Sequence, residues 1–252
     1  MKIGFVHIPR TGGTYLEAVL QSMGPEKFIN FFGTPSNQIQ NKVGLIENIE
    51  KDKSMCNRIL TNPNWETCNL FSGHFSMNID ECVGGDEVKY ITILREPIQR
   101  VTSFVKKVTT SKKFSSILNN NSNKVGDEIF WENFEQYIKS KNKNGLMVHE
   151  RHGFSNYMTK VIAGLDLSDE NIIVDEKVYT KAKENLDNMV YVGLFEEYGK
   201  TVNDILQLFN IQSNFNDNGL KISSVPDSTK KLMEELNQYD IKLYKYFTNK
   251  ND

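Results

Sequence analysis

Residues 3–23 read IGFVHIPRTGGTYLEAVLQSM, and this stretch decides the fold. Residues 3–8 are apolar in the manner of a buried strand, and residues 9–14 have the composition of a turn. Over residues 15–23, three apolar side chains recur at helical spacing, namely Leu16, Val19 and Leu20. The stretch therefore predicts a strand, a glycine-containing turn and a helix.

The same alternation of strands and helices continues along the chain. Residues 89–94 (KYITIL) and 189–194 (MVYVGL) are apolar and rich in β-branched side chains, which is typical of strands. Helical patterns occur over residues 98–108, 130–138, 153–163, 198–209 and 230–247. This alternation predicts an α/β fold with a central parallel sheet flanked by helices, and ligands are then expected at the carboxyl ends of the strands.

Length and composition indicate one globular domain. The chain has 252 residues, of which 38% are hydrophobic, and this is enough for a single domain over residues 1–252. Its formal net charge of −2 gives no general attraction to nucleic acid or to an anionic membrane. No signal peptide or bilayer-length apolar run is found, and three cysteines match no zinc or CxxC spacing. We therefore expect a cytoplasmic protein whose anionic ligands need a local basic pocket.

The turn after the first strand has the composition of an anion-binding site. Gly12 and Gly13 allow a close approach of the backbone to a ligand, and the following helix presents free N–H groups. Arg10, Thr11 and Thr14 add side-chain donors. The turn is therefore suited to phosphate or sulfate, the alternative being an ordinary turn between a strand and a helix.

This turn is not a Walker A loop. That motif reads G-x-x-x-x-G-K-[ST] and needs a lysine directly before the hydroxyl residue. Here Gly13 precedes Thr14, and His7 occupies the position of the first glycine. The use of ATP or GTP is thereby disfavoured.

A second basic segment follows the strand over residues 89–94. In TILREPIQRVTSF, Arg95 comes directly after the strand, and Ser103 lies two helical turns farther on. An arginine fork with a nearby hydroxyl is suited to bind a phosphate group. Taken alone, Arg95 and Arg100 can also be interpreted as surface partners of Glu96.

His74 is the candidate general base. It lies in FSGHF, between the two basic segments along the chain. The ordinary pKa of a histidine, about 6.5, suits the removal of a proton from a hydroxyl near neutral pH. The alternative is a histidine that serves only packing or capping. Its position between two predicted anion-binding segments favours the catalytic interpretation.

These segments together resemble sulfotransferases that use 3′-phosphoadenosine 5′-phosphosulfate (PAPS). HIPRTGGT looks like the family's 5′-phosphosulfate loop, particularly that of the carbohydrate (heparan uronosyl 2-O type) branch. Residues 92–104 are similar to the 3′-phosphate motif, and residues 71–75 resemble the Gly-His segment that contains the base. Weaker similarity extends over residues 155–164, 191–196 and 236–244. The resemblance covers most of the chain, with residues 111–143 as its main gap.

The resemblance implies a P-loop-NTPase-like, three-layer fold and an in-line transfer without a metal. The sulfuryl group of PAPS would move onto a hydroxyl of a carbohydrate, lipid or other small-molecule acceptor, with 3′,5′-diphosphoadenosine (PAP) as the product and His74 as the base. The family's usual lysine is replaced by Arg10, which stabilises a leaving phosphate electrostatically but does not give it a proton. The implied donor contacts are Arg10, Thr11, Gly12, Gly13, Thr14, Tyr15, Arg95, Ser103 and Lys221.

Two other functions are compatible with the motifs. A P-loop-type kinase would consume Mg-ATP, and a catalytically inactive nucleotide-binding module would have His74 turned away from the sulfur. The identity of the acceptor and the oligomeric state are not contained in these motifs, because acceptor pockets are built from variable loops. A metal site at His149 and His152 is disfavoured, since no HExxH pattern or third ligand accompanies them.

Overall fold

The computed structural model describes residues 1–31, 59, 61–77, 79, 88–109, 128–139, 152–167, 169, 171–212, 215 and 224–251. Within these residues, five parallel strands form one sheet in the order β2-β3-β1-β4-β5. The strands are β1 (Lys2–Val6), β2 (Phe28–Asn30), β3 (Leu70–Gly73), β4 (Val88–Leu94) and β5 (Tyr191–Leu194). The predicted α/β fold with a parallel sheet is confirmed.

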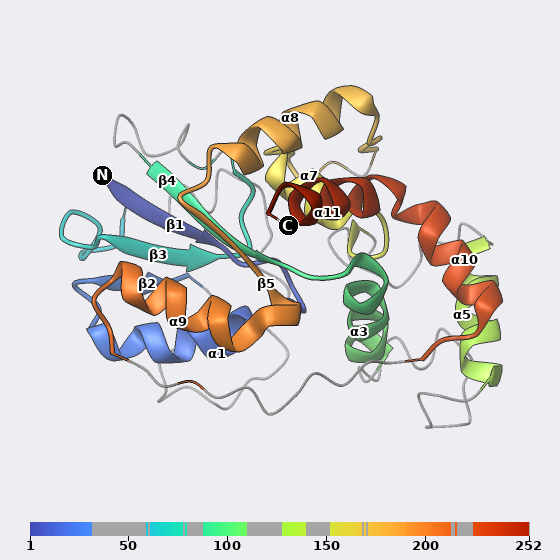
Figure 1. Ribbon diagram of the computed structural model, residues 1–252, viewed down its shortest axis with the longest axis horizontal. Helices are drawn as coiled ribbons and strands as arrows, with labels where there is room; N and C mark the ends of the chain where they lie inside the picture. Colours follow the sequence, from blue (N-terminus) through green and yellow to red (C-terminus); the bar gives the residue numbers. More distant parts are fainter. Residues whose placement is uncertain are drawn as a thin grey trace.

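Helices cover both faces of the sheet and its carboxyl end. The α-helices are α1 (Gly13–Leu20), α3 (Pro97–Thr109), α5 (Glu128–Lys139), α7 (Tyr157–Ile162), α8 (Glu176–Asp187), α9 (Tyr198–Leu208), α10 (Asp227–Leu236) and α11 (Gln238–Asn251). Two short 3₁₀-helices, η1 (Gln21–Met23) and η3 (Phe195–Glu197), adjoin α1 and α9. In Figure 1, α1 and α9 lie on one face, α7, α8 and α11 lie towards the other, and α3, α5 and α10 lie beyond the carboxyl ends of the strands.

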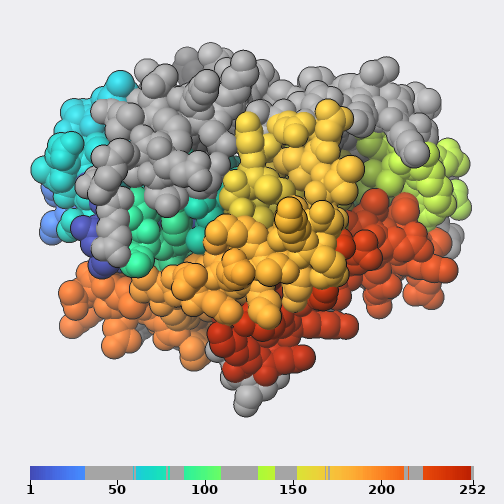
Figure 2. Space-filling model, turned by 90° about the horizontal axis from the view of Figure 1, so that it is seen from above, coloured from blue at the N-terminus to red at the C-terminus, as the bar shows by residue number. Residues whose placement is uncertain are grey.

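The two faces of the sheet are formed by alternate residues of each strand, as the period of two requires. On one face, Phe5 and Ile91 pack with the apolar side chains of α1 and α9. On the other face, Phe71 and Tyr90 pack with the side chains of α7 and α8. Figure 2 shows α8 and the neighbouring 152–167 segment in the middle of this second face. Because helices cover both faces, a ligand is expected between the carboxyl ends of the strands and the helices beyond them.

A separate apolar cluster positions α3, the helix that follows β4. Ile98, Val101 and Val105 of α3 pack against Phe130 and Trp131 of α5. All five side chains are buried. The opposite side of α3 faces the turn after β1, so this packing fixes α3 next to the predicted anion site. None of the described helices is both long and apolar enough to cross a membrane.

Three elements were not predicted, and one prediction is wrong. Strands β2 and β3 have only three and four residues, too few for a periodic signal. Helix α8 was missed although Asp175 caps it, accepting a hydrogen bond from the backbone N–H of Val178 at 2.9 Å. The single helix predicted over residues 230–247 is two helices, α10 and α11, which are separated at Asn237.

At the break, the side-chain oxygen of Asn156 accepts hydrogen bonds from N–H groups in the first turn of α11, at 3.0 and 3.2 Å, and so caps a new helix. The Asn237 side-chain oxygen accepts a hydrogen bond from the backbone N–H of Asn156 at 2.9 Å. One turn later, the Asp240 carboxylate accepts hydrogen bonds from the N–H groups of Met158 and Thr159, at 3.1 and 2.8 Å. These bonds satisfy the N-terminus of α7. Helix α7 is also shorter than predicted, because Asn156 before it has a left-handed φ of 45°.

Candidate functional site

The two basic segments meet at the carboxyl edge of the sheet. Arg10, in the turn after β1, donates from Nε to the hydroxyl of Ser103 on α3 at 2.9 Å. Arg95, at the end of β4, donates from Nη1 to the backbone carbonyl of Arg10 at 2.9 Å. Residues that are 85 to 93 positions apart in the sequence are thereby joined in one cluster. The structure brings together three of the predicted contacts, and they come from adjacent strands.

The turn has an unusual backbone conformation. Arg10 has φ of 76° and Gly12 has φ of 88°, both in the left-handed region. For a residue with a side chain, this region costs about 1–2 kcal/mol, and such strain is often found at functional sites. The hydroxyl of Thr11 donates to the carbonyl of Ile8 at 2.8 Å, so its proton is used to hold the turn.

The two glycines make room for aromatic rings beneath the turn. A Cβ atom on Gly13 would lie 2.3 Å from Cδ2 of His7, and one on Gly12 would lie 2.5 Å from Cε2 of Tyr198. Both glycines are therefore required by packing as well as by the left-handed φ of Gly12. No side chain caps α1, while Thr14 and Tyr15 are exposed in its first turn. The N–H of Tyr15 donates to the carbonyl of Gly12 at 3.2 Å, whereas the earlier N–H groups, of Gly13 and Thr14, have no side-chain cap and suit an anion.

The cluster is cationic and partly desolvated. Burial lowers the pKa of Arg10. Burial also lowers the pKa of Arg95, with the carboxylate of Glu196 opposing this shift and the charge of Arg10 adding to it. The Arg95 guanidinium is also stacked 4.3 Å from the centre of the Phe195 ring. Two guanidinium groups held this close to each other favour a ligand that carries several negative charges.

Arg100 is not part of this cluster and is not a surface residue. Its side chain is fully buried, and Nη2 donates to the carbonyl of Gly153 at 2.7 Å. Burial lowers the pKa of Arg100, opposed by the nearby carboxylate of Asp240. Glu96 instead caps α3, accepting from the N–H groups of Ile98 and Gln99 at 3.2 and 2.7 Å. The interpretation of Arg100 as a surface partner of Glu96 is therefore wrong.

His74 lies directly after β3, on the neighbouring strand of the sheet. Its ring is partly exposed and meets the ring of His7 edge to face, with centroids 4.7 Å apart and an interplanar angle of 67°. His7 itself is buried and contacts the carboxylate of Glu17, with Nδ1 and Oε1 2.9 Å apart. The sequence marked His7 only as a departure from the Walker A motif, and it contained no signal for Glu17.

An aromatic group, consisting of Tyr15, Phe195, Tyr198 and Phe215, lies beside the turn. Tyr15 is 4.7 Å from Phe215 between ring centroids, and Tyr198 is 5.3 Å from Phe195 and 5.4 Å from Phe215. The Tyr198 hydroxyl donates to the carbonyl of Gly12. Of this group only Tyr15 was predicted as a contact, because the other three side chains are brought to the turn by β5 and α9 and show no motif.

The remaining predicted residues either lie outside the described residues or have other partners. Lys221 and His149 lie outside the described residues, as do residues 110–127. His152 has both ring nitrogens occupied, since Nε2 donates to the Asp169 carbonyl at 2.9 Å and Nδ1 accepts from Lys160 at 3.3 Å. Burial lowers the pKa of Lys160 to about 8. Among the described residues, no group of three His, Cys, Asp or Glu side chains is placed to hold a metal.

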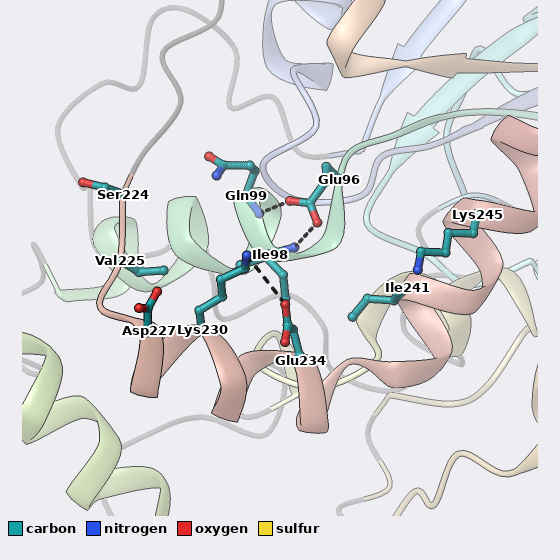
Figure 3. Close-up of a pocket in the computed structure, with 10 residues that line it drawn as sticks. All are labelled: Glu96, Ile98, Gln99, Ser224, Val225, Asp227, Lys230, Glu234, Ile241 and Lys245. Carbon is teal, nitrogen blue, oxygen red and sulfur yellow. Dashed lines mark hydrogen bonds and ion pairs between the residues drawn. The ribbon is translucent and has the colours of Figure 1, made fainter.

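A cavity of about 500 Å³ adjoins α3 on the side of α10 and α11. Figure 3 shows Glu96 and Gln99 at the start of α3 facing Ser224 and the side chains of α10 and α11. Its lining contains three carboxylates, of Glu96, Asp227 and Glu234, and two ammonium groups, of Lys230 and Lys245. This balance does not suit a polyanion, so an anionic ligand is better accommodated at Arg10 and Arg95.

The comparison with protein families agrees with this geometry. Residues 1–247 match the family described as the sulfotransferase family, which is nearly the whole chain. No curated protein matches the sequence. The parallel sheet, with a phosphate-type turn after its first strand, is consistent with the P-loop-like fold of sulfotransferases. The chain belongs to the sulfotransferase family.

Proposed function

We propose that the protein transfers the sulfuryl group of PAPS onto an acceptor hydroxyl. The observation that carries the proposal is the cluster of Arg10, Arg95 and Ser103 at the carboxyl ends of β1 and β4. PAPS has phosphate groups at both ends of its ribose, and two adjacent guanidinium groups on separate elements suit such a ligand. A donor with only one charged end would leave one of the two arginines without a role.

The donor's charges are assigned to particular groups. The 5′-phosphosulfate is expected at the turn, with Arg10, the N–H groups at the start of α1, and Thr14. The 3′-phosphate is expected at Arg95, directly after β4, and at Ser103 on α3. The cation–π contact of Arg95 with Phe195 keeps the guanidinium in place without using its remaining donors.

The adenine is assigned to the aromatic group beside the turn. Tyr15 is 46% exposed, so part of its ring is accessible to a ligand. Stacking on an aromatic ring is worth about 1–3 kcal/mol per base. The adjacent rings of Phe215 and Tyr198 fix the position of Tyr15. This arrangement supports a nucleotide donor rather than inorganic sulfate.

In the proposed reaction, His74 takes the proton of the acceptor hydroxyl. The acceptor oxygen forms a bond to sulfur while the bond from sulfur to the phosphate oxygen breaks, and PAP leaves with the electron pair. Arg10 stabilises the charge that develops on this oxygen but keeps its own protons. The absence of a lysine before Thr14 speaks against the kinase alternative.

The proposal is tested with an acceptor panel analysed by mass spectrometry. The protein is incubated with PAPS and a panel of oligosaccharides, hydroxylated lipids and phenols. A compound that gains about 80 Da, the mass of SO₃, identifies the acceptor class. The control is His74→Ala, in which the gain should fall by about 10²–10⁴-fold while PAP binding is kept. A His74→Ala variant that transfers at the parent rate contradicts the assignment of the base. If none of the panel compounds gains SO₃ from PAPS, the result counts against sulfotransferase activity.

A further inference from the structure

A second histidine and a carboxylate lie behind His74. His7 follows β1 and Glu17 belongs to α1, and their side chains are each 6% exposed. Nδ1 of His7 is 2.9 Å from Oε1 of Glu17, and Ser72 of β3 donates its hydroxyl to the same oxygen. The ring of His7 in turn contacts the ring of His74. Glu17, His7 and His74 therefore form one connected line of side chains, and Ser72 lies outside this line, bonded only to Glu17 in these contacts.

The surroundings leave His7 one orientation. A carboxylate only accepts hydrogen bonds, so the hydrogen between the two side chains belongs to Nδ1 of His7. The ring is stacked on Phe5, with centroids 5.7 Å apart and an interplanar angle of 7°. Its other edge is against Gly13, where a Cβ atom would lie 2.5 Å from Nε2. The tautomer and the ring plane of His7 are therefore both determined by its neighbours.

Packing alone does not explain these residues. Moving a carboxylate out of water costs several kcal/mol, and an apolar pair of similar volume is often as stable as a buried ion pair. Glu17 is buried at this cost directly beneath the anion-binding turn. The burial of Glu17 is explained if the protein's function needs a negative charge or a fixed imidazole at this position.

We propose that His7 and Glu17 are positioning residues for His74. His7 holds the His74 ring in the orientation that accepts the acceptor's proton, and the charge of Glu17 stabilises the imidazolium that then forms on His74. Only one proton moves, from the acceptor hydroxyl to His74, and neither His7 nor Glu17 gains or loses one. This inference rests on the proposed role of His74 as the general base.

The first test is Glu17→Gln, which keeps a side-chain oxygen as acceptor but removes the charge. We expect kcat to fall by about 10- to 100-fold with the panel compound that shows the largest SO₃ gain. The KM for PAPS and the Kd of PAP should change less than about twofold, because no donor contact is removed. Ser72→Ala is the matched control: it deletes the other hydrogen bond to the same oxygen, keeps the charge, and should lower kcat less than about threefold.

A combined variant distinguishes this inference from the proposed function. In the His74→Ala background, Glu17→Gln should cause no further loss, because Glu17 acts through His74. If His74→Ala is slow and Glu17→Gln alone turns over at the parent rate, the positioning role is wrong and the base assignment is retained. If His74→Ala itself turns over at the parent rate, both are wrong.

The second test needs no acceptor, and its decisive measurement is made on the native protein. Long-range ¹H–¹⁵N NMR correlations report which ring nitrogen of each histidine carries hydrogen, and the chain has four histidines. In the native protein, His7 should have hydrogen on Nδ1. The His74 signals should shift in Glu17→Gln and stay in place in Ser72→Ala. A native His7 with a bare Nδ1 overturns the inference.

Discussion

Arg95 offers the sharpest quantitative test of the donor site. Its side chain is 9% exposed, donates to the Arg10 carbonyl and stacks on Phe195, so its guanidinium is oriented before a ligand arrives. Truncating a charge-assisted contact in such a partly desolvated site costs about 2–4 kcal/mol. Arg95→Ala should therefore weaken PAP binding by about 30- to 1,000-fold. Isothermal titration calorimetry measures this change directly.

Two companion variants separate the charge of Arg95 from its geometry. Arg95→Lys keeps the positive charge but loses the planar, bidentate guanidinium. Its Kd for PAP should lie between those of the parent and Arg95→Ala. Lys107→Ala removes a positive charge from an exposed position on α3, the helix that follows Arg95, and should change the Kd of PAP less than about twofold. Circular dichroism checks that each variant is folded. Equal losses in Arg95→Ala and Lys107→Ala would refute the reasoning, because the effect would then come from net charge alone.

Three further predictions concern neighbouring groups. Arg100→Ala should lower the free energy of unfolding by about 3–5 kcal/mol, because it leaves the buried carboxylate of Asp240 without this nearby positive charge. A decrease below about 1 kcal/mol, measured by urea unfolding, would contradict this. Arg10→Lys should retain measurable turnover if the role of Arg10 is electrostatic. Complete loss of turnover would mean that the bidentate geometry of the guanidinium is required. Lys160 has a folded pKa of about 8 against 10.5 in an exposed state, so between these values the unfolded chain binds more protons and native stability rises with pH. Lys160→Met should accordingly add most stability below pH 8 and progressively less towards pH 10.5, and a pH-independent gain would be contrary evidence.

The sequence correctly predicted those elements whose signals lie in contiguous residues. Residues 3–23 predicted β1, the turn and α1, because apolar periodicity and the glycine pair are both local properties. Only the family resemblance placed Arg10 and Ser103 at one donor site, since no local rule connects residues 93 positions apart, and their direct hydrogen bond was not predicted. The family resemblance therefore predicted a long-range association that hydrophobic periodicity does not reveal.

The parts that were missed depend on tertiary structure. Whether an arginine is buried is decided by what packs around it. The sequence therefore left open the alternative that Arg100 is a surface partner of Glu96, whereas Arg100 is buried and donates to the Gly153 carbonyl. Likewise, the break at Asn237 depends on Asn156, which lies 81 positions earlier in the sequence and whose side chain caps α11. Glu17 appears in the sequence as an ordinary helix residue, and only the arrangement of β1 and β3 around it reveals its contact with His7.

The central claim is that the cluster of Arg10, Arg95 and Ser103 binds a nucleotide with a 3′-phosphate. Titration calorimetry with PAP and with ATP in the presence of Mg²⁺ tests it most directly, because ATP has a longer 5′-phosphate chain but lacks the 3′-phosphate that Arg95 is expected to bind. The account predicts that PAP binds at least about 100-fold more tightly than ATP, a difference of about 2.7 kcal/mol. Equal affinities, or a preference for Mg-ATP, would contradict it.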